Sequence, residues 1–437
     1  MRAKIDVSGR LLPCGANLAL GLRPRVIPNG QLSRRCLSST ATETRVEPQC
    51  APTLLDIGTR AVMDSDHDQF RELCRGFYEQ NVKPHTAEWE QAGMVSREVW
   101  RQAGDAGMLC VTVPEEDGGL GLDIRFSAVN WEEQSYSNCT GPGFFLHSEI
   151  VAPYLVHYGT PEQKKKYLPK MISGECITAI AMTEPGAGSD LAGMTTSAKR
   201  DGDYYVLSGS KTYITNGYMS DMVIVCAKTA PDKGAKGISL FLVDANTPGF
   251  SKGKPLKKVG MKAQDTCELF FEDVRVHKSA MLGEENKGFV YLMTELPQER
   301  LLVGVMALAN AEASFEWTRS FVKERKAFGA RLADKQVIAH KLADMKTELT
   351  VARTFADHCI KLHSQKRLDN VTASMVKAHL TDLHTKVVDD CMQLHGGAGF
   401  MSEYPIATAW LDGRVSRIYA GANAIMKELI ARDIVKK

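Results

Sequence analysis

The sequence predicts an α+β protein in which a helical segment, an antiparallel β segment and a second helical segment follow one another. The spacing of apolar residues changes from helical to strand-like near Cys176 and returns to helical after Gly288. No helical pattern separates the short strands, so the β segment cannot form βαβ units. The predicted parts are a leader at 1–50, a helical domain at 51–175, a β domain at 176–285 and a helical domain at 286–437.

The first helical domain carries clear helix signals. Apolar residues at steps of three and four predict one buried stripe, made of Phe70, Leu73, Cys74 and Phe77. Asp64 and Ser65 are suitable N-caps for that helix. Thr160 followed by Pro161 predicts the start of another helix.

The β domain is predicted from short apolar and β-branched runs separated by turns that contain Gly and Pro. The predicted strands span residues 204–208, 212–215, 222–227, 238–243 and 267–274.

The second helical domain contains a long helix of the kind that packs in a bundle. Its apolar positions recur at steps of three and four, at Val376, Leu380, Leu383, Val387, Cys391 and Leu394. Gly396 and Gly397 follow His395 and predict a glycine C-cap.

Composition excludes several classes of function. The formal net charge of +2 over 437 residues, without a basic run interleaved with aromatics, gives no reason to expect nucleic acid as a partner. Apolar runs such as 301–309 are too short to span a membrane, which takes ~20 residues. Eleven cysteines without metal-ligand spacing predict buried thiols and neither a disulfide framework nor a metal site.

Residues 1–42 contain seven Lys or Arg residues and a single acid, Asp6. Arg-rich, acid-poor segments that contain Ser are typical of mitochondrial transit peptides, which predicts a matrix protein. The alternative is a basic tail without a targeting role. Under either interpretation this segment is left out of the fold prediction.

Glu299 is the most informative residue, because it lies between apolar runs that end at Met293 and resume at Leu301. A carboxylate buried without a partner would cost several kcal/mol, so such a group must be solvated, paired, neutralised or used. Pro297 removes a helical hydrogen bond close to it. The stretch alone allows a solvated acid at a helix end or a buried functional carboxylate.

Three further segments are candidates for ligand binding. The glycine-rich loop 183–190 can direct backbone N–H groups and the Ser189 hydroxyl at a phosphate, although a plain tight turn has the same pattern. Tyr213 and Thr215 lie on one face of a strand, where they suit a flat heterocycle or simply form a sheet face. Arg325 offers a guanidinium fork to a phosphate, but most arginines at a helix end are only solvated.

From about Leu54 onwards, these segments in this order resemble the acyl-CoA dehydrogenase family of mitochondrial flavoenzymes. The stretches at 131–139, 295–302 and 426–432 resemble its long-chain members in particular.

The resemblance implies an N-terminal helical domain, a middle β domain and a C-terminal four-helix bundle, assembled as a homotetramer. It implies FAD at a subunit interface and an acyl-CoA substrate. A base would remove the thioester α-proton while the β-hydride passes to the flavin. The product would be a trans-2-enoyl-CoA, and electron-transferring flavoprotein would accept the electrons.

The resemblance also implies site residues. Those expected at the flavin of their own subunit are Ile180, Ala181, Met182, Thr183, Gly186, Gly188, Ser189, Tyr213, Ile214 and Thr215. Those expected at the FAD of a partner subunit are Arg325, Phe328, Gln336, Gln393, Leu394, His395, Gly396 and Gly397, and further FAD contacts are expected from Ala422, Asn423 and Ala424. Those expected at the acyl-CoA are Ser189, Pro297, Gln298, Arg300, Ala420 and Gly421.

Much of the family carries its base in the motif I-Y-E-G-T, where this chain has Ile418-Tyr419-Ala420-Gly421-Ala422. Ala420 cannot act as a base. Long-chain and isovaleryl members carry the base at the position of Glu299, which the resemblance therefore implies as the catalytic residue. The backbone N–H of Ala420 is still expected to donate to the thioester oxygen. Ala422 and Tyr213 depart from residues common in the family.

Two alternatives stay open at this point. An isovaleryl-type enzyme for short branched acyl-CoAs uses the same base position. A catalytically silent assembly scaffold of the same fold would explain the replacements at Ala420 and Ala422. A peroxisomal oxidase is disfavoured, because the chain ends in Val-Lys-Lys and not in Ser-Lys-Leu.

Overall fold

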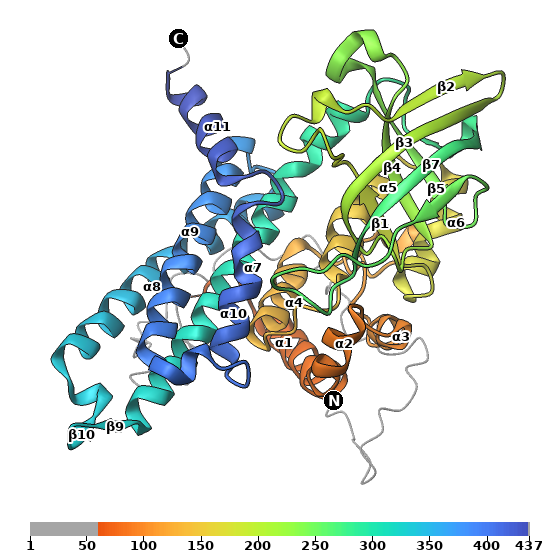
Figure 1. Cartoon of the computed structure of the whole chain (residues 1–437). Helices are drawn as coiled ribbons and strands as arrows, with labels where there is room; N and C mark the ends of the chain where they lie inside the picture. The colour runs from red at the N-terminus through yellow and green to blue at the C-terminus, as the bar shows by residue number, and fades with distance from the viewer. Residues whose placement is uncertain (1–59, 436–437) are drawn as a thin grey trace, which may run out of the picture. The chain divides into compact units, whose positions relative to one another are not determined.

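A computed structural model gives the structure of residues 60–435 (Figure 1). The predicted transit segment lies outside the described residues. Within them, a helical part, a sheet and a second helical part follow one another, so the predicted α, β, α order is confirmed.

Local capping explains where the N-terminal helices begin. These helices are α1 (Ser65–Phe77), α2 (Thr86–Ala92), α3 (Arg97–Asp105), α4 (Ile124–Tyr136), α5 (Ala152–Tyr158) and α6 (Pro161–Ile172). The Asp64 carboxylate accepts from the first-turn N–H groups of α1, and Thr160 caps α6, as predicted. The predicted stripe on α1 is wrong at Leu73, which is 42% exposed. The core contacts of α1 come from Phe70, Cys74 and Phe77.

The middle part is one sheet with the strand order β6-β7-β3-β2-β4-β5-β8, and β1 pairs with β4 (Figure 1). Its strands are β1 (Thr178–Ala181), β2 (Ser197–Asp201), β3 (Tyr204–Thr215), β4 (Met222–Lys228), β5 (Ile238–Asp244), β6 (Phe250–Lys252), β7 (Thr266–His277) and β8 (Met281–Leu282). Alternating residues of β3 and β7 enter a core that they share with β4 and β5.

The sheet differs from the prediction in three ways. Four of its strands, β1, β2, β6 and β8, were not predicted. The two strands predicted at 204–208 and 212–215 are one strand, β3, which shifts register against β7 after Leu207 and again after Lys211. The sequence has a turn-like pattern where these irregularities occur, which is why one strand was predicted as two. In addition, β1 pairs with β4 in parallel, so the sheet is not wholly antiparallel.

The C-terminal part is a helical bundle. It contains α7 (Gly288–Glu324), α8 (Gln336–Ser364), α9 (Asn370–His395) and α10 (Pro405–Gly413), followed by α11 (Asn423–Val435), which packs on α9. A short hairpin of β9 (Lys326–Ala327) and β10 (Ala330–Arg331) joins α7 to α8. The predicted glycine C-cap of α9 is confirmed at Gly396, whose φ is 59°.

Helix α7 is 37 residues long and continues through Pro297. Because proline has no N–H, the carbonyl four residues before Pro297 accepts no helical hydrogen bond from this position. The helix is therefore locally weaker beside Glu299, but it does not end there.

Buried charges join the two helical parts. Arg353 of α8 donates to Glu312 of α7 and, at 2.6 Å, to Glu132 of α4. Arg71 of α1 donates to Glu132 at 2.7 Å and to Glu133 at 2.9 Å. Because the glutamates are buried, each needs these partners, and the network fixes α4 against α1, α7 and α8.

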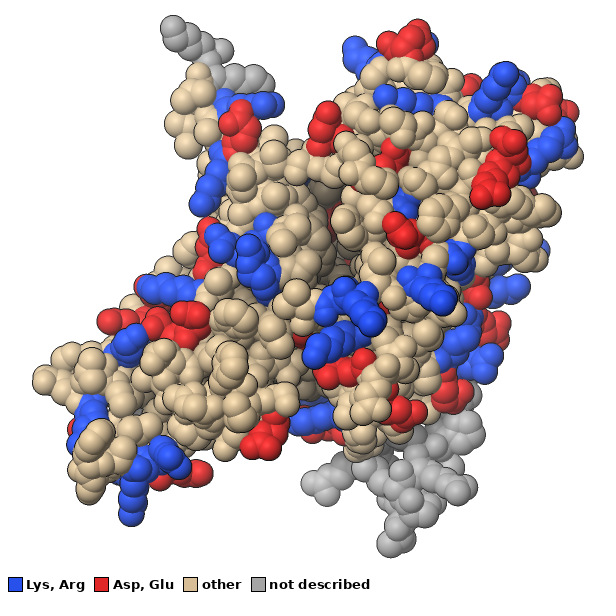
Figure 2. All heavy atoms as spheres, viewed as in Figure 1, with Lys and Arg blue, Asp and Glu red and all other residues tan. Residues whose placement is uncertain are grey.

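On the face in Figure 2, acidic and basic side chains are interspersed, and the surface is hollowed between the C-terminal helices and the sheet. No helix within residues 60–435 is long and apolar enough to cross a membrane. The eight cysteines in this range are buried thiols.

Candidate active site

Glu299 is buried, with 4% of its surface exposed, on the part of α7 that follows Pro297. The pKa of its carboxyl is raised to about 7, mainly by burial and in smaller part by the nearby charge of Glu295. A hydrogen bond from Tyr154 and the charge of Arg300 oppose that rise. Of the two interpretations the sequence allowed, the solvated helix-end acid is excluded.

Helix α5 faces the glutamates of α7 with a matching spacing. The Tyr154 hydroxyl donates to Glu299 Oε1 at 3.1 Å. One turn away, the Tyr158 hydroxyl donates to Glu295 Oε1 at 2.8 Å, and His157 Nδ1 lies 2.8 Å from the same oxygen. Both glutamates are thus held by α5.

The neighbours of Glu299 are engaged inside the chain. Gln298 donates from its side chain to the carbonyl of Glu149 at 2.7 Å. Arg300 is buried and donates to Asn370 and Ser374 at the start of α9. Glu149 is a second fully buried carboxyl whose pKa is raised to about 7 by burial, against a hydrogen bond from Ser127.

The segment at Ala420 and Gly421 adopts left-handed backbone conformations, with φ values of 51° and 89°. Lys377, buried on α9, donates to the Gly421 carbonyl at 2.7 Å and to the Asn423 side chain at 2.9 Å. Within residues 60–435, the Ala420 N–H donates to no other group. The segment is therefore fixed in place while the Ala420 N–H stays unused.

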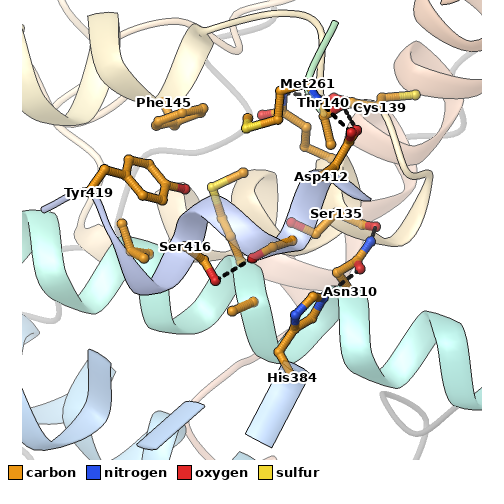
Figure 3. Close-up of a pocket in the computed structure, with 15 residues that line it drawn as sticks. Ser135, Cys139, Thr140, Phe145, Met261, Asn310, His384, Asp412, Ser416 and Tyr419 are labelled. Carbon is orange, nitrogen blue, oxygen red and sulfur yellow. Dashed lines mark hydrogen bonds between the residues drawn. The ribbon is translucent and has the colours of Figure 1, made fainter. Parts of the chain in front are cut away.

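A cavity of about 60 Å³ lies beside α7 (Figure 3). Helix α7 lines it with Val303, Met306, Ala307 and Asn310, which share the helix face of Glu299 at steps of three and four. Tyr419, next to Ala420, also lines it. The cavity is mainly apolar along this wall and has polar groups at Asn310, His384 and Asp412.

The first set of predicted flavin residues comes together at the ends of β1 and β3. Ile180 and Ala181 end β1, the Thr183 carbonyl accepts from the Thr212 N–H at 2.9 Å, and Ile214 is buried. Gly186, Gly188 and Ser189 lie on the exposed loop. Tyr213 is 69% exposed, and its φ of 60° turns it away from the regular strand.

This loop is held by a buried ion pair that the sequence analysis missed. Lys211 Nζ lies 2.8 Å from Glu184 Oε1 and also donates to the Met182 carbonyl at 3.0 Å. Burial acts to raise the pKa of Glu184, but the bonds from Lys211, Thr195 and Thr196 outweigh it and hold that pKa at about 2.

The second set of predicted flavin residues gathers at the other end of the bundle. Arg325, Phe328 and Gln336 are exposed at the end of α7, on the hairpin and at the start of α8, and Phe328 is 96% exposed. His395 stacks on Phe321, whose carbonyl accepts from the Arg325 N–H. Gln393, Gly396 and Gly397 are exposed beside it, and Leu394 is half-buried.

The two sets are not brought together within one chain. In Figure 1 the hairpin lies at the far end of α7 and α8 from the sheet. The remaining predicted contacts lie near Lys377. Asn423 uses its side chain on Lys377, Thr381 and Asp382, whereas Ala422 is half-buried and Ala424 is exposed.

Sequence reasoning missed three supporting residues, namely Tyr154, Lys377 and Lys211. For Tyr154 a signal was present, because Tyr154 and Tyr158 have the same four-residue spacing as Glu295 and Glu299. No local pattern distinguishes the two lysines from solvated ones.

The geometry can be compared with known proteins. Profiles of the N-terminal, middle and C-terminal domains of acyl-CoA dehydrogenases match residues 64–175, 179–274 and 286–435. The chain belongs to the acyl-CoA dehydrogenase family. The resemblance seen in the sequence is thus confirmed.

Similar acyl-CoA dehydrogenases include a mitochondrial long-chain specific enzyme of Mus musculus. It is 56% identical over 416 residues, which cover 95% of this chain and 96% of that protein. The structure of an acyl-CoA dehydrogenase from Geobacillus kaustophilus matches with a TM-score of 0.84 at 47% identity, covering 85% of this chain and 99% of that one. A glutaryl-CoA dehydrogenase from Mycobacterium smegmatis, solved in complex with FADH2, matches with a TM-score of 0.82 at 27% identity, covering 89% and 98%.

Proposed function

We propose that this protein catalyses the FAD-dependent α,β-dehydrogenation of long-chain fatty acyl-CoA, with Glu299 as the base. The observation that carries the proposal is the buried Glu299 carboxyl, whose pKa of about 7 suits proton transfer at neutral pH. A base of this kind is needed because the C–H bond beside a thioester is a weak acid.

The developing negative charge on the thioester oxygen also needs a donor. The Ala420 N–H is unused within residues 60–435 and belongs to a segment that Lys377 holds in place. A backbone donor requires no particular side chain. The replacement of the usual glutamate by alanine therefore does not remove this contribution.

The chain-length assignment rests on the similar proteins, because the mouse long-chain specific enzyme is 56% identical over 95% of this chain. The cavity lies along α7 between Val303 and Asn310, a distance of about 10 Å at ~1.5 Å per residue. An acyl chain that starts beside Glu299 is proposed to follow this wall.

The residues present fit a flavin. The exposed Tyr213 and the open loop at Gly186 and Gly188 offer a flat ring face and backbone donors, and a Cβ on either glycine would meet no atom within 4 Å. When bound, FAD supplies the hydride acceptor. The exposed Arg325 and Phe328 are proposed to contact the FAD of a partner subunit in a homotetramer.

We further propose that the enzyme works in the mitochondrial matrix and passes electrons to electron-transferring flavoprotein. The basic, acid-poor segment at 1–42 supports the location. The similar mouse enzyme is mitochondrial.

The experiment is the visible spectrum of the purified protein before and after addition of palmitoyl-CoA. A flavin spectrum that bleaches is expected, with turnover measured by reduction of an acceptor. Glu299→Gln is expected to keep the flavin and lose ~10³-fold in turnover, as removal of a general base does. Glu149→Gln is the matched control, because Glu149 is also buried with a pKa of about 7 but lies on another element.

Each alternative predicts a different result. Near-normal turnover by Glu299→Gln would eliminate Glu299 as the base. A rate optimum at a five-carbon branched acyl-CoA would favour the isovaleryl-type enzyme. A colourless protein that cannot bind added FAD would favour the silent scaffold.

A further inference from the structure

The distal end of the cavity is polar, although an unsubstituted fatty acyl chain ends in a methyl group. Asn310, His384 and Asp412 line this end. Figure 3 draws His384 between Asn310 and Ser416. The imidazole packs tightly there, because a Cβ added at Gly413 would come within 1.9 Å of its ring.

Hydrogen bonding defines the orientation of the His384 ring. Asn310 donates from its side-chain nitrogen to the Ser135 carbonyl at 3.3 Å and to Asn138 Oδ1 at 3.1 Å. Its oxygen is therefore an acceptor, and His384 Nε2, 2.8 Å away, must be the donor.

This arrangement leaves His384 Nδ1 as a lone acceptor. It is buried and has no hydrogen-bond partner within the described residues. Because the two ring nitrogens lie on opposite sides of the imidazole, Nδ1 faces away from Asn310. Burial lowers the pKa of His384 to about 4, so the ring is neutral at pH 7 and Nδ1 cannot donate.

Two of the other polar side chains that line the cavity, Asp412 and Ser416, are already paired. Asp412 accepts from the Thr140 hydroxyl at 2.5 Å and from the Met261 N–H at 2.5 Å. The Ser416 hydroxyl donates to the Gly413 carbonyl at 2.7 Å. An occupant that satisfies Nδ1 must therefore bring its own donor and, beside Asp412, should not be an anion.

We propose that this end of the cavity binds a hydroxyl group carried near the distal end of a long acyl chain, whose O–H donates to His384 Nδ1. The inference rests on the proposed function, because it places the acyl chain along α7. Asn310 lies about 16 Å beyond Glu299 at ~1.5 Å per residue. With ~1.5 Å C–C bonds in a zigzag, that length takes roughly a dozen carbons beyond the α-carbon, so the end of a chain of about 14 to 16 carbons reaches it.

A methyl terminus and a hydroxyl terminus differ in whether His384 Nδ1 has a hydrogen-bond partner once the chain is bound. The methyl group displaces any water from Nδ1 and leaves a buried acceptor unpaired, whereas the hydroxyl group replaces the water. A site built to bond a hydroxyl therefore discriminates against the analogue that lacks it.

The test compares ω-hydroxypalmitoyl-CoA with palmitoyl-CoA on the flavin-loaded enzyme. The kcat/KM for the hydroxylated chain is expected to exceed that of the plain chain by roughly tenfold, which corresponds to one unpaired buried acceptor. His384→Leu should bring this ratio to about one or lower. Met306→Leu, which changes an apolar residue of the same cavity, should leave the ratio as in the wild type.

The outcomes are separable. Turnover of palmitoyl-CoA with a wild-type ratio of one or less overturns the hydroxyl proposal alone, whether or not His384→Leu folds. A ratio that His384→Leu leaves unchanged also overturns it. Absence of turnover with both chains overturns the proposed function and this inference together.

Discussion

The Tyr154 hydroxyl is expected to set the acid limb of the pH profile. Proton abstraction needs the Glu299 carboxylate, so kcat/KM should rise with pH and level off above the pKa of about 7. The bond from Tyr154 stabilises the charged form of Glu299 and so lowers its pKa. Tyr154→Phe removes that donor and should move the limb to higher pH.

The size of the shift follows from the geometry. A hydrogen bond to a charged group contributes roughly 1.5–3 kcal/mol. At 3.1 Å the bond from Tyr154 is long for an O–H donor, so the lower end of that range applies. Since one pKa unit corresponds to ~1.36 kcal/mol, the limb should move by about one pH unit.

The assay is the pH dependence of kcat/KM for palmitoyl-CoA. Tyr158→Phe is the matched control, because it removes the same hydroxyl from the same helix but acts on Glu295. A profile for Tyr154→Phe that stays within a few tenths of a pH unit of the wild type, or moves to lower pH, would refute the assignment. An equal shift in both variants would indicate a general effect of α5.

Three other outcomes are expected. Lys377→Met should keep the flavin spectrum but lower kcat by roughly tenfold, because the Gly421 carbonyl loses its hydrogen bond from Lys377. The rate of flavin bleaching in a rapid-reaction assay measures the loss. Glu184→Gln should lower the melting temperature at pH 7, as measured by calorimetry. The difference in melting temperature from the wild type should shrink as the pH falls from 4.5 toward 2. The reason is that the partners of Glu184, which lower its pKa in the folded state, stabilise only its ionised form. Arg353→Met should destabilise the fold by about 3–5 kcal/mol in denaturant titrations, because it removes a charged partner from two buried glutamates.

The order of the domains and the ends of the helices could be predicted because their causes are local. Asp64, Thr160 and Gly396 act within a few residues of the ends that they define. Leu73 was misplaced because three- and four-residue spacing defines a stripe but not its edges. The parallel strand β1 was missed because its four residues are all buried, and a short run without alternation resembles any buried segment.

In the candidate site, too, features with local causes could be predicted and features that depend on distant contacts could not. Glu299 could be singled out from its apolar surroundings, but its burial depends on Tyr154, 145 positions away in the sequence. The unused N–H of Ala420 depends on a loop conformation that Lys377 fixes from α9. Contacts between distant segments have no signature in a single sequence, so the supporting residues became visible only in the fold.

The proposed contact of the exposed hairpin tip at Phe328 with the FAD of a partner subunit would make cofactor retention depend on protein concentration. With eight of the 21 proposed flavin contacts supplied by a second chain, the affinity for FAD would be linked to subunit association by mass action. Dilution should then release flavin, and added flavin should in turn promote reassembly. A substitution on the hairpin, far from Glu299, would appear in an assay as slow loss of activity at low enzyme concentration.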